Sequence, residues 1–397
     1  MGTVIRPVSV AERRARLAVR HHLAASSRGA ASPGGVAGAV ADIIALHGTD
    51  PASVYLAAWA RTGASRADIE HALYAEGALV RMLGMRRTVF VVPAGLMPVI
   101  QAACTDQIAE RMRRDLARRV QESGIAPDGA AWLKEAGEAT VRVLSARGSA
   151  TGAELARDEP RLRAQIVYPA AEGKSYGGPV NVTTRLLTLL SAEGLIVRGR
   201  PRGGWTSSQF TWSAAPDQPC PDAAAARAEL ARRWLLAFGP ASPDDLQWWA
   251  GWTAAQVRQA LSQLEVTAVD LEGTAGVMLA ADEDPPPAAA PWPALLPALD
   301  PAAMGWRERG WYVGRHAAAL FDRSGNIGPT AWWDGRIVGG WAQRKDGEIA
   351  VRLLEDAGAE AAAALAAEAR RLSEWIGDPK VRITPRFRTP LERELSG

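Results

Sequence analysis

SRADIEHALYAEGALVRMLGMRRTVFVVP, residues 65–93, joins an amphipathic helical pattern to an apolar strand pattern. Ser65 is a preferred helix N-cap residue, the apolar residues that follow it recur at helical spacing, and Gly77 is a preferred helix stop. MRRTVFVVP (85–93) is rich in β-branched and apolar residues and ends at a proline, which favours a strand. Together with the helical run before it, this order predicts a winged helix that spans roughly residues 10–100.

The same order of elements returns in residues 101–220. A long, polar helical stretch comes first, and Thr151 then caps a short helix. PVNVTTRLLTLLSAEG (179–194) predicts a second helix that begins at Pro179. LIVRGR and QFTWSA follow as two strands of a hairpin, so we expect a second winged helix behind a helical connector.

A third copy occupies residues 221–281, and a different pattern follows it. A long helix precedes two short helices whose N-caps are Ser242 and Thr253, and VTAVDLEG and GVMLA form the wing. Residues 282–397 begin with a proline-rich linker and continue as strand-like segments, which are WYVG, ALFDRSG, TAWWDGRIVGGWAQR and EIAVRLL. The helix GAEAAAALAAEARRLSEWIG closes this part, so we expect a small antiparallel sheet or barrel packed by a helix.

Composition excludes several classes of protein. Cys104 and Cys220 are the two cysteines, and the five histidines form no cluster, which excludes a disulfide framework and multi-cysteine zinc sites. We therefore expect no metal and no cofactor. The formal net charge is +3, and 46 basic residues include only four lysines. The abundant arginine reflects either GC-rich codon usage or contact with phosphate.

We expect a soluble, cytoplasmic protein without a membrane partner. No apolar run approaches the ~20 residues that a membrane-spanning helix needs. The N-terminal residues MGTVIRPVSVAERRARLAVRHHL carry charges where a signal peptide has its apolar stretch.

Five segments of the chain, in order, resemble the AlkZ/YcaQ family of bacterial winged-helix DNA glycosylases. They are LHGTDPASVYLAAWAR, LGMRRTVFVVPA, WLLAFGPASPDDLQWWAG, PALDPAAMGWRER and GPTAWWDGRIVGGW. The resemblance runs from about residue 13 to about residue 383. It implies a monomer with a concave basic surface for duplex DNA. The predicted fold class is α+β, with three tandem winged helix-turn-helix units followed by a small antiparallel β-barrel or sheet with a C-terminal helix.

The resemblance also implies a catalytic motif, from which this chain departs. The family has Gln, a small apolar residue, then Gln or Asp, followed by Asp-Pro; this chain has His47, Gly48 and Thr49 before Asp50-Pro51. A neutral His47 with an ordinary pKa near 6.5 suits a general base, and Thr49 can position the same water. The alternative for His47 is a surface or capping histidine. Asp50 either fixes the imidazole tautomer or, as we favour, caps the next helix.

Further candidate DNA contacts lie on the first strand, the second wing and the C-terminal hairpin. Arg86 and Thr88 keep the family pattern, whereas Phe90 replaces a histidine and either reshapes a pocket or belongs to the core. The second wing carries candidate phosphate contacts, with an exposed hairpin as the alternative, at Arg198, Arg200 and Arg202. The hairpin 321–341 either probes a DNA groove or packs its indoles against the closing helix, and its candidates are Arg323, Asn326, Trp332, Trp333 and Arg336.

These observations predict a monofunctional DNA glycosylase of base excision repair. The resemblance implies removal of bulky N7-alkylguanine and related alkylpurine adducts from duplex DNA, with self-resistance to a DNA-alkylating natural product as the role. Water is the expected nucleophile, because a Schiff base needs an amine and lysine is scarce. The rival hypotheses are a non-catalytic winged-helix DNA-binding protein, either a transcription regulator or a lesion sensor, and a protein-interaction scaffold.

Overall fold

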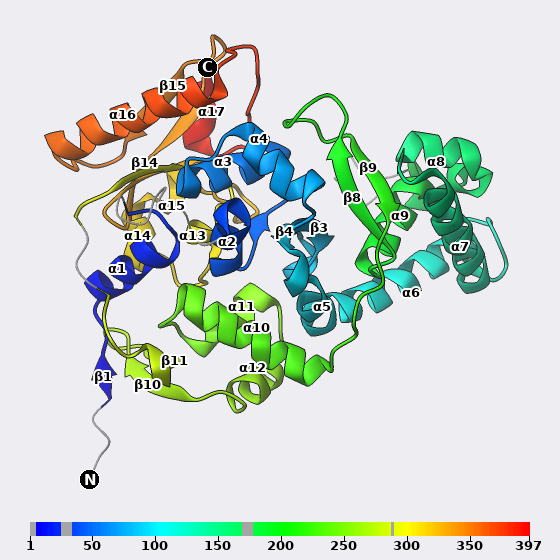
Figure 1. The fold of residues 1–397 in the computed structure, drawn as a ribbon, viewed down its shortest axis with the longest axis horizontal. Coiled ribbons are helices and arrows are strands. Elements are labelled where there is room, and N and C mark those ends of the chain that lie inside the picture. Colours follow the sequence, from blue (N-terminus) through cyan, green and yellow to red (C-terminus); the bar gives the residue numbers. More distant parts are fainter. Residues whose placement is uncertain (1–4, 25–33, 169–177, 287–289) are drawn as a thin grey trace.

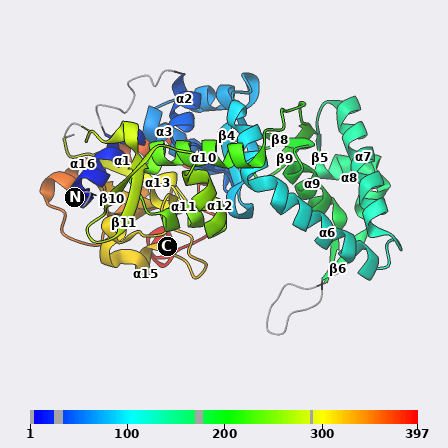
Figure 2. The same cartoon turned by 90° about the horizontal axis from the view of Figure 1, so that it is seen from below.

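The computed structural model describes residues 5–24, 34–168, 178–286 and 290–397. It is a mixed α+β structure in which the segment from about residue 106 to about residue 214 forms a lobe at one side of a larger body (Figures 1 and 2). The N-terminal helices, the third predicted unit and the C-terminal sheet all lie in the body. The interface between body and lobe therefore falls beside the first predicted unit.

The structure contains the helices and the hairpin predicted for the first unit. Its elements are α2 (Gly35–Asp42), β2 (Leu46–His47), α3 (Pro51–Thr62), α4 (Arg66–Glu70), β3 (Leu79–Leu83) and β4 (Val89–Pro93). Ser65 caps α4 in a capping box with Asp68, which confirms the predicted helix start. The helix continues through His71–Ala75 as a π-helical turn.

The predicted strand 85–93 starts too early. Met85–Arg87 form a 3₁₀ turn, and Val89 is the first strand residue. Arg86 and Arg87 both have positive φ angles, 51° and 59°, so the side-chain alternation of a strand does not extend through them. The sequence pattern was wrong here because two arginines beside apolar residues do not reveal a left-handed turn.

The second predicted unit forms the lobe. Its elements are α6 (Asp106–Glu122), α7 (Gly129–Arg147), β5 (Ala150–Thr151), α8 (Gly152–Asp158), β6 (Gln165–Tyr168), β7 (Gly178–Asn181), α9 (Val182–Ala192), β8 (Ile196–Pro201) and β9 (Phe210–Ala214). Thr151 caps α8 as predicted. The predicted start of the next helix at Pro179 is wrong, because Pro179 pairs with Val167 in a two-stranded sheet and α9 begins at Val182.

The hairpins of the first two units share one sheet. Its strand order is β2-β4-β3-β8-β9-β5, and Arg81 opposite Arg198 is the residue pair that joins β3 to β8. The loop after β8 also reaches back to the body, where Trp205 packs 5.3 Å from Tyr55 and 5.6 Å from Trp375, measured between ring centroids. Sheet and loop thus fix the lobe beside residues 46–49.

The third predicted unit follows its sequence pattern closely. It consists of α10 (Ala223–Phe238), α11 (Pro243–Ala250), α12 (Ala254–Leu261), β10 (Val266–Asp270) and β11 (Ala275–Leu279). Ser242 and Thr253 both form capping boxes, as their positions predict. The short strand β1 (Arg6–Pro7) adds to β10 in parallel, and α1 (Val10–Arg20) packs on α10. That all three units are winged helices stays a prediction.

The C-terminal part is an antiparallel sheet covered by helices. Its strands are β12 (Pro293–Leu296), β13 (Thr330–Trp333), β14 (Arg336–Gln343) and β15 (Ile349–Leu353), paired in that order. The predicted closing helix, α16 (Ala359–Ile376), packs on β12 and β15, and α17 (Pro390–Ser396) packs on β14. These pairings describe a sheet, and closure into a barrel stays a prediction.

Two strand predictions in this part are wrong. WYVG lies in α14 (Gly310–Val313), and the start of ALFDRSG lies in α15 (Ala317–Leu320). Four-residue apolar runs do not distinguish a strand from a buried helical turn. Trp311 and Tyr312 are buried here in a helix. Because buried strands contain the same residue types, apolar character alone could not distinguish a strand from a helix.

The apolar residues form one large core in the body and a separate core in the lobe. The body core joins the first and third units to the C-terminal sheet, and it includes Trp234, Trp292 and Trp332. Within the described ranges, no helix combines the length and the apolar character needed to cross a membrane.

Candidate functional site

Residues 46–50 form a short strand and a helix cap. Leu46 pairs with Val91 and His47 pairs with Phe90, so β2 is an edge strand of the shared sheet. The Gly48 N–H donates to the Val89 carbonyl at 2.7 Å. Asp50 then caps α3, because its carboxylate accepts from the Ser53 N–H at 3.2 Å and from the Ser53 hydroxyl at 2.6 Å. The capping interpretation of Asp50 is confirmed.

His47 lines a small, mostly apolar pocket on one side of this loop. The pocket walls are Ile43, Ala45, Arg86, Phe90, Phe238, Trp249, Leu299, Pro301 and Met304. It has about 20 Å³ of space for the centre of a water molecule, which is room for roughly one water. The imidazole lies 5.6 Å from the Phe90 ring, measured between centroids, and its Nδ1 is buried without a described hydrogen-bond partner.

The pocket keeps His47 uncharged. Burial, and secondarily the charge of Arg86, lower the pKa of His47 from 6.5 to about 4. The expectation of an ordinary pKa is therefore wrong. At neutral pH the imidazole is a weakly basic hydrogen-bond acceptor and not a proton acceptor poised near pH 7.

Thr49 lines a different and much larger hollow. This groove, of about 800 Å³, lies between the first unit and the lobe. Its polar and basic lining residues are Thr49, Thr151, Asn181, Thr183, Thr184, Thr188, Arg198, Arg202, Ser208, Gln209 and Arg386. His47 lines the small pocket but not the groove, and Thr49 lines the groove but not the small pocket. The structure therefore does not place these two side chains around one shared water as predicted.

Arg81 supports the loop from beneath and was missed in the sequence. Its side chain is buried, and its Nη1 donates to the Gly48 carbonyl at 2.6 Å. The guanidinium also stacks 4.6 Å from the centroid of Phe210. A single arginine within the apolar run LVRML was the signal for it, because an arginine in a buried strand needs specific partners.

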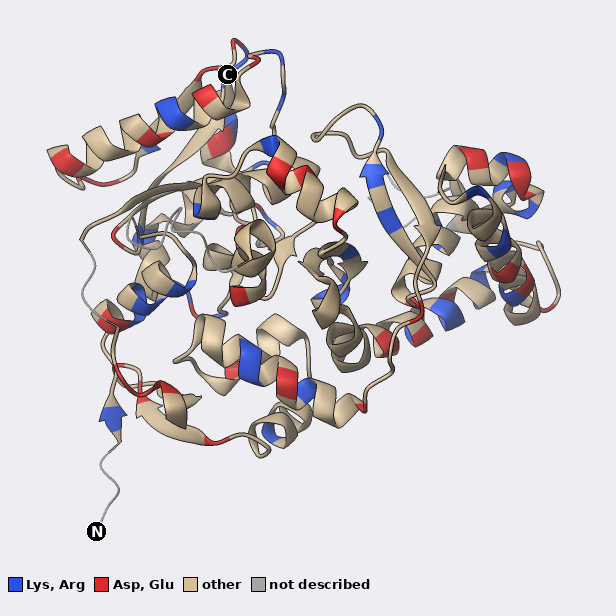
Figure 3. Cartoon of the chain, in the orientation of Figure 1, with Lys and Arg blue, Asp and Glu red and all other residues tan. Residues whose placement is uncertain are grey.

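The second wing contributes two of its three candidate arginines to the groove. Arg198 stacks 5.0 Å from Trp212 and lines the groove, and burial lowers its pKa to about 10. Arg202 lines the groove and pairs with Glu154 at 2.7 Å. Arg200 instead pairs with Glu70 at 3.1 Å, which links the wing to α4. Figure 3 shows basic positions, in blue, on β8 beside β3.

Two of the candidates from residues 85–93, Arg86 and Phe90, line the His47 pocket. Arg86 stacks 3.9 Å from Trp248 and lines the His47 pocket. Phe90 is both core and pocket wall, so its two interpretations coincide. The Thr88 N–H donates to the Met85 carbonyl and closes the turn that places Arg86.

The C-terminal hairpin packs largely into the body. Trp332 is fully buried, stacks 5.5 Å from Tyr312 and donates from its indole to the Thr330 hydroxyl, so it is not available to DNA and its candidacy was wrong. The other four candidates keep some exposure. Trp333 is half-buried, Arg336 pairs with Glu355 at 3.0 Å, Asn326 donates to Asp322 at 2.9 Å, and Arg323 is exposed.

No group of three or more His, Cys, Asp or Glu residues within the described ranges is arranged to hold a metal ion.

Comparisons with known proteins show a similar fold and a family. A comparison with curated proteins finds no match. The solved structure of the Streptomyces sahachiroi DNA glycosylase AlkZ is similar, with a TM-score of 0.71 and 20% identity, covering 93% of this chain and 97% of that one. A sequence model described as DNA glycosylase AlkZ-like matches residues 40–375. This match covers most of the chain, so the chain belongs to the AlkZ-like family of DNA glycosylases.

Proposed function

We propose that this glycosylase excises N7-alkylated guanine and related bulky alkylpurines from duplex DNA by hydrolysis. Such a base already carries a positive charge, so it leaves without being protonated. The enzyme then has to hold a water and to stabilise a sugar with oxocarbenium character. The observation that carries the proposal is the neutral His47 imidazole in a pocket with room for about one water.

The low pKa of His47 suits this chemistry. An imidazolium would place a further cation beside a cationic base and a cationic sugar, whereas a neutral imidazole accepts a hydrogen bond from water. Because the sugar becomes electron-poor as the base leaves, the attacking water becomes acidic and a weak base is sufficient. His47 thus replaces the amide that the family motif has at this position.

The groove on the Thr49 side supports DNA binding. Its arginines match phosphate oxygens, and its hydroxyl and amide groups donate hydrogen bonds to a sugar-phosphate backbone. We assign the Thr49 hydroxyl to the DNA side of the loop and His47 to the water side. A bulky adduct favours recognition in such an open groove over rotation into a deep pocket.

We further propose that the protein acts as a monomer in the cytoplasm and protects its host from a DNA-alkylating natural product. The departure of His47, Gly48 and Thr49 from the family motif supports a specialised substrate. Neighbouring biosynthetic genes for such a compound are the expected genomic context.

The test is release of modified base from a duplex that carries an N7-alkylguanine. Mass spectrometry measures the released base, and cleavage of abasic sites gives the rate above spontaneous depurination. His47→Ala is expected to abolish enzymatic release, and Thr49→Val to reduce it. His71→Ala, which removes an exposed histidine from the first unit, is the matched control and is expected to release base normally.

The outcomes separate the rival hypotheses. Release that persists in His47→Ala contradicts the assignment of His47. Salt-dependent DNA binding without any release indicates a non-catalytic DNA-binding protein. Absence of both indicates a protein-interaction scaffold.

A further inference from the structure

A second basic hollow lies between the lobe and the turn before β4, and it shares no lining residue with the groove that Thr49 lines. It has a volume of about 310 Å³ and is lined by Arg87, Met112, Asp115, Leu116, Arg118, Arg119, Arg185 and Leu189. Its four arginines come from the turn before β4, from α6 and from α9. Residues that are distant in sequence therefore bring their guanidinium groups to one place.

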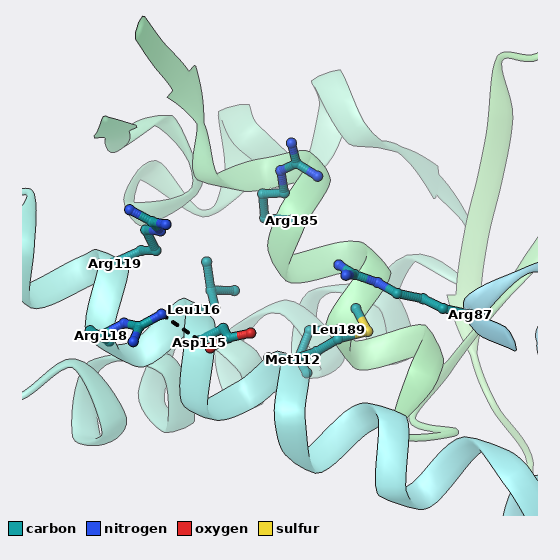
Figure 4. A pocket seen from close by; sticks show the side chains of 8 residues that line it. All are labelled: Arg87, Met112, Asp115, Leu116, Arg118, Arg119, Arg185 and Leu189. Atoms are coloured by element: carbon teal, nitrogen blue, oxygen red, sulfur yellow. Dashed lines mark hydrogen bonds and ion pairs between the residues drawn. The ribbon is translucent and has the colours of Figure 1, made fainter. Parts of the chain in front are cut away.

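The hollow has a basic rim and an apolar floor. Figure 4 shows Arg87, Arg119 and Arg185 standing around the space, with Met112, Leu116 and Leu189 beneath it. Leu116 and Leu189 are buried. Asp115 is the carboxylate among the lining residues and pairs with Arg118 at 3.3 Å, while Glu122, beside the hollow, pairs with Arg119 at 3.4 Å. The lining residues themselves carry four guanidinium groups and one carboxylate.

Backbone geometry directs Arg87 into this hollow. Arg86 and Arg87 are successive residues with φ angles of 51° and 59°, a conformation that costs free energy for residues other than glycine. The turn is held by the Thr88 N–H, which donates to the Met85 carbonyl at 3.0 Å, and by the Gly84 N–H, which donates to the Thr88 carbonyl at 2.8 Å. It sends Arg86 to the His47 pocket and Arg87 to the hollow.

A third hollow connects these two sites. It is lined by both Arg86 and Arg87, and by Gln107 and Arg111 of α6. It shares Arg86 with the His47 pocket and shares Arg87, Met112 and Asp115 with the four-arginine hollow. A track of arginines thus runs from the catalytic motif outwards along α6.

We propose that the four-arginine hollow binds a backbone phosphate of duplex DNA that flanks the lesion, with the adjoining deoxyribose on the apolar floor. This proposal rests on the proposed function. Guanidinium forks match phosphate oxygens, and the apolar face of a sugar suits the floor of methionine and leucine. The bound phosphate anchors the strand at a distance from the reacting sugar.

The test measures binding to an undamaged duplex, so its result does not depend on excision. Fluorescence anisotropy gives Kd over a salt titration from about 50 to about 200 mM, a range in which phosphate binding produces strong salt dependence. The test variant is Arg119→Gln/Arg185→Gln. The matched control is Arg142→Gln, an exposed arginine on α7 of the same lobe.

The association constant K falls as salt rises, and each neutralised phosphate makes the plot of log K against log salt steeper by about 0.9. Loss of one phosphate contact therefore makes this plot shallower by about 0.9 and weakens binding roughly eightfold at about 0.1 M salt. For the double variant we expect this plot to be shallower than that of the wild type by about 0.9 to about 1.8. Arg142→Gln should bind as the wild type does. Arg185→Lys keeps the charge and is expected to retain the slope. Unchanged circular dichroism of the double variant establishes that it is folded.

A double variant whose slope and Kd equal those of Arg142→Gln would overturn the proposal. Inorganic phosphate at equal ionic strength is expected to displace the duplex from the wild type more strongly than chloride does, and this difference should be lost in the double variant. If the wild-type protein bound the duplex but excised no base, the proposed function would be contradicted, whereas the phosphate site in the four-arginine hollow would stand.

Discussion

Replacing His47 by Gln should remove a specific pH dependence of folding stability. The pKa of His47 is lowered from 6.5 in the unfolded chain to about 4 in the folded protein, mainly by burial. The unfolded state therefore binds a proton more readily than the folded state, and stability is lost as pH falls below about 6.5. The loss is complete below about pH 4, where both states are protonated.

The magnitude follows from the two pKa values. The full separation corresponds to about 3 kcal/mol, and the part that develops between pH 7 and pH 5 is about 2 kcal/mol. His47→Gln keeps a neutral hydrogen-bonding side chain but has no group that titrates in this range. The stability difference between wild type and variant should therefore change by about 2 kcal/mol between these pH values, at the expense of the wild type.

Urea unfolding of both proteins at pH 8, 7 and 5 measures this difference. His21 is also buried and also has a lowered pKa, but it is present in both proteins and cancels in the comparison. The difference should be nearly constant between pH 8 and pH 7, which is the internal control. A difference that stays the same at pH 5 would refute the burial of a neutral imidazole at this position.

Three further substitutions test other parts of the site and fold. Gly48→Ala should shift the loop by a few tenths of an ångström and reduce excision, because an added Cβ would lie 3.1 Å from the Phe90 backbone and 3.2 Å from the Val89 carbonyl; single-turnover rates measure this. Asp300→Ala should lower the free energy of unfolding by about 3–5 kcal/mol, since it leaves Arg61 buried and unpaired, and urea titration measures the loss. Trp205→Ala should cost about 3–5 kcal/mol if measured in the same way, because this indole packs the lobe against the body.

Local signals in the sequence predicted the elements of the fold well. Ser65, Thr151, Ser242 and Thr253 each begin a helix as predicted, because a cap is decided by a few neighbouring residues. The failures occurred where tertiary context decides. The Gly310–Val313 segment is apolar in any conformation, and its placement as a helix depends on the core that surrounds it.

The resemblance predicts where the catalytic motif lies in the sequence, which stays a prediction, but the geometry of this loop could not be predicted. The resemblance placed the catalytic motif at His47 and Thr49, and the structure puts these residues in an edge strand and loop beside a basic groove. His47 and Thr49 line separate hollows because residues of α10 and the C-terminal part form walls of the His47 pocket. No local sequence pattern encodes these distant contacts. Arg81 was missed for the same reason, since its role comes from the distant Gly48 carbonyl and Phe210.

The distribution of charge around the motif is consistent with hydrolysis of an already cationic base. Guanidinium groups near the loop are held against aromatic rings, as with Arg86 on Trp248 and Arg198 on Trp212, so they stay at the walls of the hollows. Burial removes charge from His47, where a further cation would oppose the developing charge on the sugar. A neutral imidazole and an amide can both accept a hydrogen bond from the attacking water without adding charge at pH 7. We therefore propose that the substitution in the motif exchanges one hydrogen-bond acceptor for another and keeps the chemistry, so that His47→Gln retains excision, whereas His47→Ala does not.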